Sequence, residues 1–122
     1  YNSDKFTSDL INSYAWDTAI VFIQNCGTNT KYSRQNILNT SLAQTGTNSL
    51  TDTRKIDVQC NIYDMASNIV EWTTETSFYS SGPCVYRGGI YNDSFSFTSY
   101  RNNAYNTSLS GNYLGFRPLL YL

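Results

Sequence analysis

The chain has 122 residues, enough for one domain with a single core, and carries 8 basic against 9 acidic side chains. This near-neutral balance, with no cluster of Lys or Arg, argues against a nucleic-acid partner. Histidine is absent, which excludes Ser–His and Cys–His nucleophilic pairs and any zinc site that needs imidazole. No apolar run is long enough to insert into a membrane. Because the chain begins at Tyr1 without Met, we expect residues 1–122 to be one domain from the C-terminal part of a longer protein.

The strongest helix signal lies in residues 8–26, "SDLINSYAWDTAIVFIQNC". Asn12 or Ser13 is a suitable N-cap, and Gly27 is a stop signal. Apolar side chains recur at helical spacing in this segment, at Trp16, Ala19, Ile20 and Ile23. We therefore expect a helix over about residues 13–25 with this stripe packed on a sheet.

The next segment, residues 27–57, is rich in Thr, Asn, Ser and Gly, which predicts long irregular loops with one short helical turn near Ile37–Leu42. Four strand-like segments follow it, at 69–75, 84–89, 94–100 and 113–122.

In the third of these segments, Phe95, Phe97 and then Ser99 lie on one side of a period-two alternation, as in a half-buried strand. One helix beside a small antiparallel sheet with long loops is an α+β architecture. We expect that sheet to include 84–89 and 113–121, with the two chain ends near each other.

Three cysteines, an odd number with no C-x-x-C spacing, stand at Cys26, Cys60 and Cys84. Two alternatives remain open for them: one disulfide with one free thiol, or three buried thiols. The sequence favours the second alternative.

Four phrases occur in a characteristic order: "NIYDMASNIVEW" at 61–72, "YRGG" at 86–89, "YR" at 100–101 and "GFRPLLYL" at 115–122. This ordered set resembles the formylglycine-generating-enzyme/sulfatase-modifying-factor family. The resemblance covers the last 60 residues well and the first 60 loosely. It implies the C-type lectin fold.

The motif residues also have a physical interpretation. Gly88 and Gly89 allow a backbone path that a side chain would block. Asp64 and Asn68 are short polar residues suited to the turn before the strand "IVEW".

Two arginines, Arg87 and Arg117, are expected to brace loops through paired hydrogen bonds to carbonyls or to carboxylates such as Glu71. We expect Trp72 and Phe116 to belong to the scaffold. If both are core, truncating either to Ala should cost about 3–5 kcal/mol of stability.

The resemblance also bears on enzymatic activity. Copper-dependent members of the family carry two cysteines just after the Gly pair, where soft sulfur holds Cu(I). Here residues 90–104 contain no Cys, and Cys84 lies before the glycines. Iron-dependent relatives use histidines, which are absent. We therefore expect no enzyme, no catalytic residue, no cofactor and no metal site, although Asn68 and Glu71 would be the oxygen donors of a structural calcium ion.

The segment between Ile90 and Leu114 has four Tyr, five Asn and five Ser, with only Asp93 and Arg101 charged. This is the composition of an antibody paratope, in which Tyr supplies rigid contact area and Ser and Asn adapt their hydrogen bonds. The alternative is an ordinary set of polar loops with Phe95 and Phe97 in the core.

A domain of this kind without catalytic groups resembles the variable proteins of diversity-generating retroelements. The resemblance implies a ligand-binding display domain on a phage virion or a bacterial cell surface, with a diversified contact surface at 90–113 that binds a protein or another cell-surface ligand. The rival interpretations are an oxidase of the formylglycine-generating type and a purely structural virion domain. Phe97 is left undecided between contact surface and core. The expected contact residues are Tyr91, Asn92, Asp93, Phe95, Asn102, Asn103, Tyr105, Asn106, Leu109, Asn112 and Tyr113.

Overall fold

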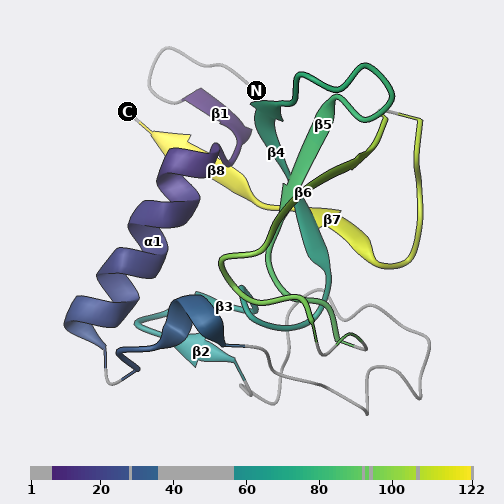
Figure 1. Cartoon of the computed structure of the whole chain (residues 1–122). Helices are drawn as coiled ribbons and strands as arrows, with labels where there is room; N and C mark the ends of the chain where they lie inside the picture. Colours follow the sequence, from purple (N-terminus) through teal and green to yellow (C-terminus); the bar gives the residue numbers. More distant parts are fainter. Residues whose placement is uncertain are drawn as a thin grey trace.

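A computed structural model describes most of the chain, namely residues 7–27, 29–35, 57–91, 93, 95–106 and 108–121, without the side chains of 104, 105 and 121. Figure 1 shows its long helix, α1, beside a sheet whose strands come from the second half of the sequence. The expected helical turn at Ile37–Leu42 lies outside the described residues.

Helix α1 spans Ser13–Cys26, as the periodicity predicts. Asn12 is its N-cap, and the side-chain oxygen of Asn12 accepts a hydrogen bond from the Ala15 N–H at 2.8 Å. At the other end, the Gly27 N–H donates to the Ile23 carbonyl at 2.8 Å. The predicted stripe faces the core: Trp16, Ile20 and Ile23 are buried, and Ala19 is half-buried.

The main sheet has four strands in the order β6-β5-β4-β7. Its strands are β4 (Val70–Thr76), β5 (Cys84–Arg87), β6 (Arg101–Tyr105) and β7 (Leu114–Phe116). β5 pairs antiparallel with both β4 and β6, while β7 pairs parallel with β4, so the sheet is mixed and not purely antiparallel. β6 was not predicted as a strand, because Arg101–Tyr105 contains three polar residues and no apolar alternation.

A second, two-stranded sheet joins the two ends of the described chain. Strand β1 (Thr7–Leu10) pairs antiparallel with β8 (Pro118–Tyr121), so the start and the end of the fold lie side by side, as expected (Figure 1). The expected single strand over 113–122 is wrong. The chain here forms two strands in two different sheets, β7 before Arg117 and β8 after it. Between them, the Arg117 carbonyl accepts a hydrogen bond from the Ile11 N–H at 2.9 Å.

The rest of the described chain before β4 is irregular apart from two short elements. A 3-10 helix, η1, spans Tyr32–Arg34, and a small hairpin joins β2 (Val58–Gln59) to β3 (Ile62–Tyr63). The hairpin turn has positive φ at Cys60 and Asn61, the combination that a two-residue turn of type I′ requires.

Residues 95–100 do not form a strand, which corrects the sequence prediction of a strand over 94–100. The alternation is present, but the buried side chains are the polar ones, Ser96 and Thr98, while Phe95 and Phe97 are exposed. Thr98 can be buried because its N–H and its hydroxyl both donate to the Gln35 carbonyl, at 2.9 and 3.0 Å. The chain here is held by residues 33–35 and not by a sheet ladder, so it lacks a strand.

The core lies between α1 and the segment that precedes β4. Its buried members are Ile11, Trp16, Ile20, Ile23, Tyr32, Met65 and Ala66. Gly88 has φ +96°, and a Cβ on Gly89 would lie 2.3 Å from the Ala66 carbonyl oxygen. Both glycines are therefore required for the close approach of this backbone to the core, as predicted.

The three cysteines are free thiols, and none of them is buried. Cys26 and Cys60 are exposed, and Cys84 is half-buried. The expectation of three buried thiols is therefore wrong, because these residues stand at a helix end, in a hairpin turn and at the start of a strand, where side chains reach solvent.

Phe116 is not a core residue, which corrects another expectation. Its side chain is 68 % exposed, and Trp72 is half-buried. Truncating Phe116 would leave no enclosed cavity, so the loss of about 3–5 kcal/mol expected for a core aromatic does not apply to it.

The fold is α+β, with one helix and small antiparallel and mixed sheets. Among the described helices, none is both long and apolar enough to cross a membrane.

Candidate functional site

The two faces of the main sheet differ in what they carry. On one face, Glu71 and Arg87 are buried, and Arg87 is paired with Asp17 of α1. On the other face, Trp72 has Tyr86 of β5 and Phe116 of β7 as its register partners. Since directly opposed residues project to the same side of a sheet, this second face carries a row of aromatic side chains.

One pocket, which we call the tyrosine pocket, opens at the end of this row where β4 begins. Its volume is about 410 Å³. Its described lining comes from β4, β5, the segment after β5 and the turn before β7, and consists of Val70, Tyr86, Ile90, Tyr91, Asp93, Ser96, Tyr100, Asn112 and Tyr113.

The floor of the tyrosine pocket is rigid. Val70 and Tyr86 are buried strand residues. The Tyr86 ring makes an edge-to-face contact with Trp72, with ring centroids 5.9 Å apart, and lies 6.2 Å from the Tyr100 ring. Such contacts between aromatic rings fix their orientation as well as burying area.

The first wall is formed by Ile90, Tyr91, Asp93 and Ser96. The Tyr91 N–H donates to the carbonyl of Asn68, a residue at φ 69°, at 2.9 Å. The Asp93 carboxylate accepts from the Phe95 N–H at 2.9 Å and from the Ser96 hydroxyl at 2.6 Å. These bonds hold the backbone of the wall while its side chains border the pocket.

The second wall is the turn that enters β7. The Leu114 N–H donates to the Gly111 carbonyl at 3.3 Å, and the Val70 N–H donates to the Tyr113 carbonyl at 3.1 Å. Tyr113 is half-buried and Asn112 is exposed. This turn is thus fixed to the first residue of β4, opposite the first wall.

A more apolar groove of about 450 Å³ lies at the far end of the aromatic row. Its described lining is Leu10, Trp72, Thr73, Cys84 and Phe116.

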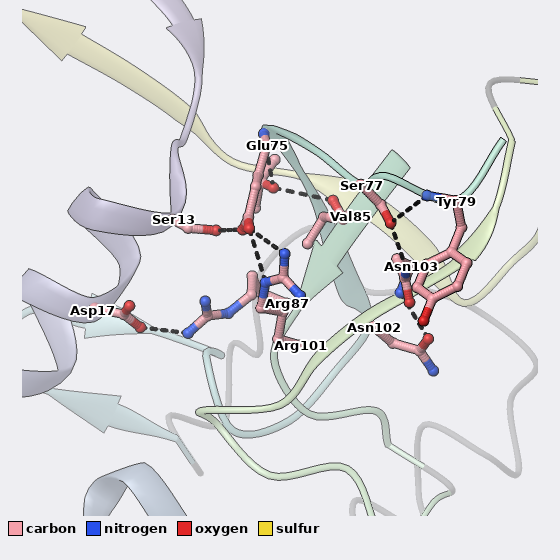
Figure 2. A network of polar contacts seen from close by, with 11 residues as sticks. Ser13, Asp17, Glu75, Ser77, Tyr79, Val85, Arg87, Arg101, Asn102 and Asn103 are labelled. Carbon is pink, nitrogen blue, oxygen red and sulfur yellow. Dashed lines mark hydrogen bonds and ion pairs between the residues drawn. The ribbon is translucent and has the colours of Figure 1, made fainter. Parts of the chain in front are cut away.

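Figure 2 shows a polar network that fastens α1, β4, β5 and β6 together. Glu75 is at its centre and accepts from the Ser13 hydroxyl and from Arg101, whose Nε lies 2.8 Å from the carboxylate. The hydrogen bonds from Arg101 hold the pKa of Glu75 below its usual value. Asn103 donates to the Ser77 hydroxyl in the same network.

The structure brings together only some of the predicted contact residues. Tyr91, Asp93, Asn112 and Tyr113 line the tyrosine pocket, although they come from both ends of the segment. Outside the pocket, Phe95 and Asn106 are exposed, and Leu109 is half-buried. Asn102 and Asn103 are half-buried on β6, and the Asn102 amide donates to the Tyr100 hydroxyl at 2.7 Å. Asn92 and the side chain of Tyr105 lie outside the described residues.

Sequence reasoning did not select Tyr86, Ser96 and Tyr100, which also line the pocket. Tyr86 belongs to the "YRGG" phrase, which precedes the expected contact surface at 90–113. The available signal was its strand position: successive side chains of a strand alternate between the two faces, so Tyr86 projects to the face opposite that of Val85 and Arg87.

The described lining of the tyrosine pocket is mainly aromatic and small polar side chains. Among its described lining residues, Asp93 is the one carboxylate, and there is no Lys, Arg or Cys. The described lining therefore offers ring surfaces, hydroxyls and amides, but no paired acid and base within it.

Two buried carboxylates elsewhere, Asp57 and Glu71, are engaged in structural contacts. Asp57 accepts from the Tyr32 hydroxyl at 2.8 Å and from the Ala66 N–H at 2.6 Å, while burial raises the pKa of both Asp57 and Tyr32. Glu71 accepts from Arg117 through both of its oxygens, at 2.9 and 2.8 Å, as predicted for this arginine. Glu71 is thus committed to an ion pair, and no group of three potential ligand residues that could hold a metal occurs in the described part of the chain.

The chain matches no protein-family model, no curated protein and no solved structure.

Proposed function

We propose that this chain is a non-catalytic ligand-binding domain and that the tyrosine pocket is the centre of its contact surface. The observation that carries the proposal is the convergence of Tyr91 and Asp93 with Asn112 and Tyr113, from the two ends of the Tyr-, Asn- and Ser-rich segment, in one pocket. The backbone on both sides of the pocket is held by hydrogen bonds to β4 and to the turn before it. A preorganised backbone with aromatic side chains at its surface lowers the entropic cost of binding.

The finer assignment is also a proposal: a C-type lectin fold of the kind found in the formylglycine-generating-enzyme family, used as in the variable proteins of diversity-generating retroelements. Its support is the resemblance of the four sequence phrases together with the structural roles of their residues. Gly89 allows the close backbone approach, and Arg117 braces Glu71, so these phrases form a scaffold beneath the pocket. By the same resemblance, we propose a place on a phage virion or a bacterial cell surface and a protein as the ligand.

Binding to intact bacterial cells tests the proposal. We expect the labelled domain to bind a subset of strains, and protease treatment of those cells to abolish binding. Tyr91→Ser and Tyr113→Ser should each weaken binding by about 1–2 kcal/mol through loss of an aromatic contact. The same variants should lose less than about 1 kcal/mol of stability, because neither residue is fully buried.

Tyr14→Ser is the matched control, since Tyr14 is 88 % exposed on α1 and does not line the tyrosine pocket. Its binding should equal that of the unmodified domain. Equal losses in all three variants, or no binding to any strain, would count against the proposal, and the second result would favour a structural virion domain.

Sequencing the gene in sibling isolates tests the diversification. We expect substitutions to concentrate between residues 90 and 113 at adenine positions of the codons, with the phrases on either side unchanged. An even spread of substitutions along the chain would contradict this part of the proposal.

A further inference from the structure

The described lining of the tyrosine pocket is rich in tyrosine and carries one acidic side chain. Four of its nine described lining residues are tyrosines: Tyr86, Tyr91, Tyr100 and Tyr113. The one charged residue of the described lining is Asp93, so the lining contributes a negative charge and no positive charge.

We propose that the tyrosine pocket binds an organic cation, namely the side chain of a Lys or Arg that the protein ligand presents. The inference rests on the proposed function and names the chemical group that this surface recognises. The tyrosine ring faces and the Asp93 carboxylate both attract positive charge. Both would therefore stabilise a cationic group bound in the pocket.

The tyrosine rings of the pocket lining favour a cationic ligand group over a neutral apolar one. The face of an aromatic ring is the negative end of its quadrupole, and a cation within about 6 Å of the ring centroid is attracted to it. Tyr86 and Tyr100 lie side by side, with centroids 6.2 Å apart, so one bound group can contact both. Their hydroxyls add acceptors that an ammonium or guanidinium group can use.

The position of Asp93 supports the same conclusion. Its two oxygens accept from the Phe95 N–H and the Ser96 hydroxyl, which orient the carboxylate at the pocket wall. Both of these donors are neutral groups. Each carboxylate oxygen can accept more than one hydrogen bond, as the donors of a guanidinium group require.

Small cations test the inference without the protein ligand. Methylguanidinium and n-butylammonium are titrated into the ¹⁵N-labelled domain while amide chemical shifts are followed. N-Methylurea and 1-butanol are the neutral counterparts of similar shape. We expect saturable shifts at Tyr91, Asp93 and Tyr113 with the cations, and affinities about tenfold weaker for the neutral compounds.

Four substitutions separate the contributions. Asp93→Asn keeps the shape and one acceptor oxygen and should weaken cation binding about fivefold or more, whereas Asp9→Asn, an exposed carboxylate on β1, should not change it. Tyr113→Phe should retain cation binding because the ring remains, while Tyr113→Leu should lose most of it.

The comparison of charged with neutral probes needs no variant, so it holds even if Asp93→Asn disturbs the wall. Equal affinity for methylguanidinium and N-methylurea, or no saturable shift with either cation, would overturn the inference. If cell binding still depends on Tyr91 and Tyr113 in that case, the proposed function stands and the cation assignment alone fails.

Discussion

Replacing Trp16 by Ala is expected to lower the free energy of unfolding by about 3–5 kcal/mol, as for other fully buried aromatic residues. Trp16 has no exposed surface and lies in the centre of the core. Its Nε1–H donates to the Thr98 carbonyl at 2.9 Å, which ties α1 to the segment behind the tyrosine pocket. The substitution would therefore remove both the largest core side chain and an anchor of that segment. Urea denaturation followed by circular dichroism measures the effect.

Two other substitutions on α1 serve as controls. Trp16→Phe keeps most of the ring but removes the donor, so it should cost less than Trp16→Ala and isolate the contribution of the bond to Thr98. Tyr14→Ala, at an exposed position of the same helix, should change stability by no more than about 0.5 kcal/mol. The interpretation fails if Trp16→Ala is as mild as Tyr14→Ala.

Replacing Arg117 by Met is expected to cost about 3 kcal/mol near neutral pH, since the buried carboxylate of Glu71 would lose its partner. The side chain of Glu71 is 10 % exposed and that of Arg117 is 26 % exposed, which places the effect at the lower end for buried pairs. Arg117 also donates to the Tyr63 carbonyl at 2.7 Å, and this acceptor would be left unmatched. Denaturation in urea at several pH values measures the loss.

The loss should depend on pH with a definite sign. Burial raises the pKa of Glu71, and Arg117 acts against this rise. A carboxyl group with a raised pKa in the folded state favours folding when it is protonated and loses that contribution as pH rises through the folded-state pKa. The penalty of Arg117→Met should therefore be largest near pH 8 and smaller near pH 5, where Glu71 takes up a proton more readily.

Two variants control for the pair. The double variant Glu71→Gln/Arg117→Met should recover part of the stability that Arg117→Met loses, because no unpaired charge then remains buried. Arg101→Met breaks the pair with Glu75 and should cost less than about 1 kcal/mol, since the side chain of Arg101 is 46 % exposed. A penalty of Arg117→Met that is small and independent of pH would show that Glu71 is well solvated without its partner.

Local signals predicted the elements whose formation depends on nearby residues. The apolar stripe of α1, its Asn12 cap and the stop at Gly27 all lie within one stretch of chain, and the helix forms there. The strands around Trp72 and Val85 were predicted for the same reason. In contrast, β1 was not predicted, because its pairing partner is β8, at the other end of the chain.

The candidate site shows the same division. Composition alone selected Tyr91, Asp93, Asn112 and Tyr113 as surface residues, but it did not distinguish them from Asn102 and Asn103, which are half-buried on β6. The sequence does not indicate that the two ends of the segment 90–113 lie close together. Their proximity depends on the parallel pairing of β7 with β4.

The sequence by itself determined the α+β class, the helix and its buried stripe, the need for Gly88 and Gly89, and a bracing role for Arg117. Each of these follows from side-chain size, charge or periodicity at known positions. Only the tertiary structure decided which side of residues 94–100 is buried, that Phe116 is exposed, and that Tyr86 and Tyr100 line the pocket. These outcomes depend on contacts such as that of Thr98 with Gln35, in which a distant backbone carbonyl satisfies a buried polar group that hydropathy would place at the surface.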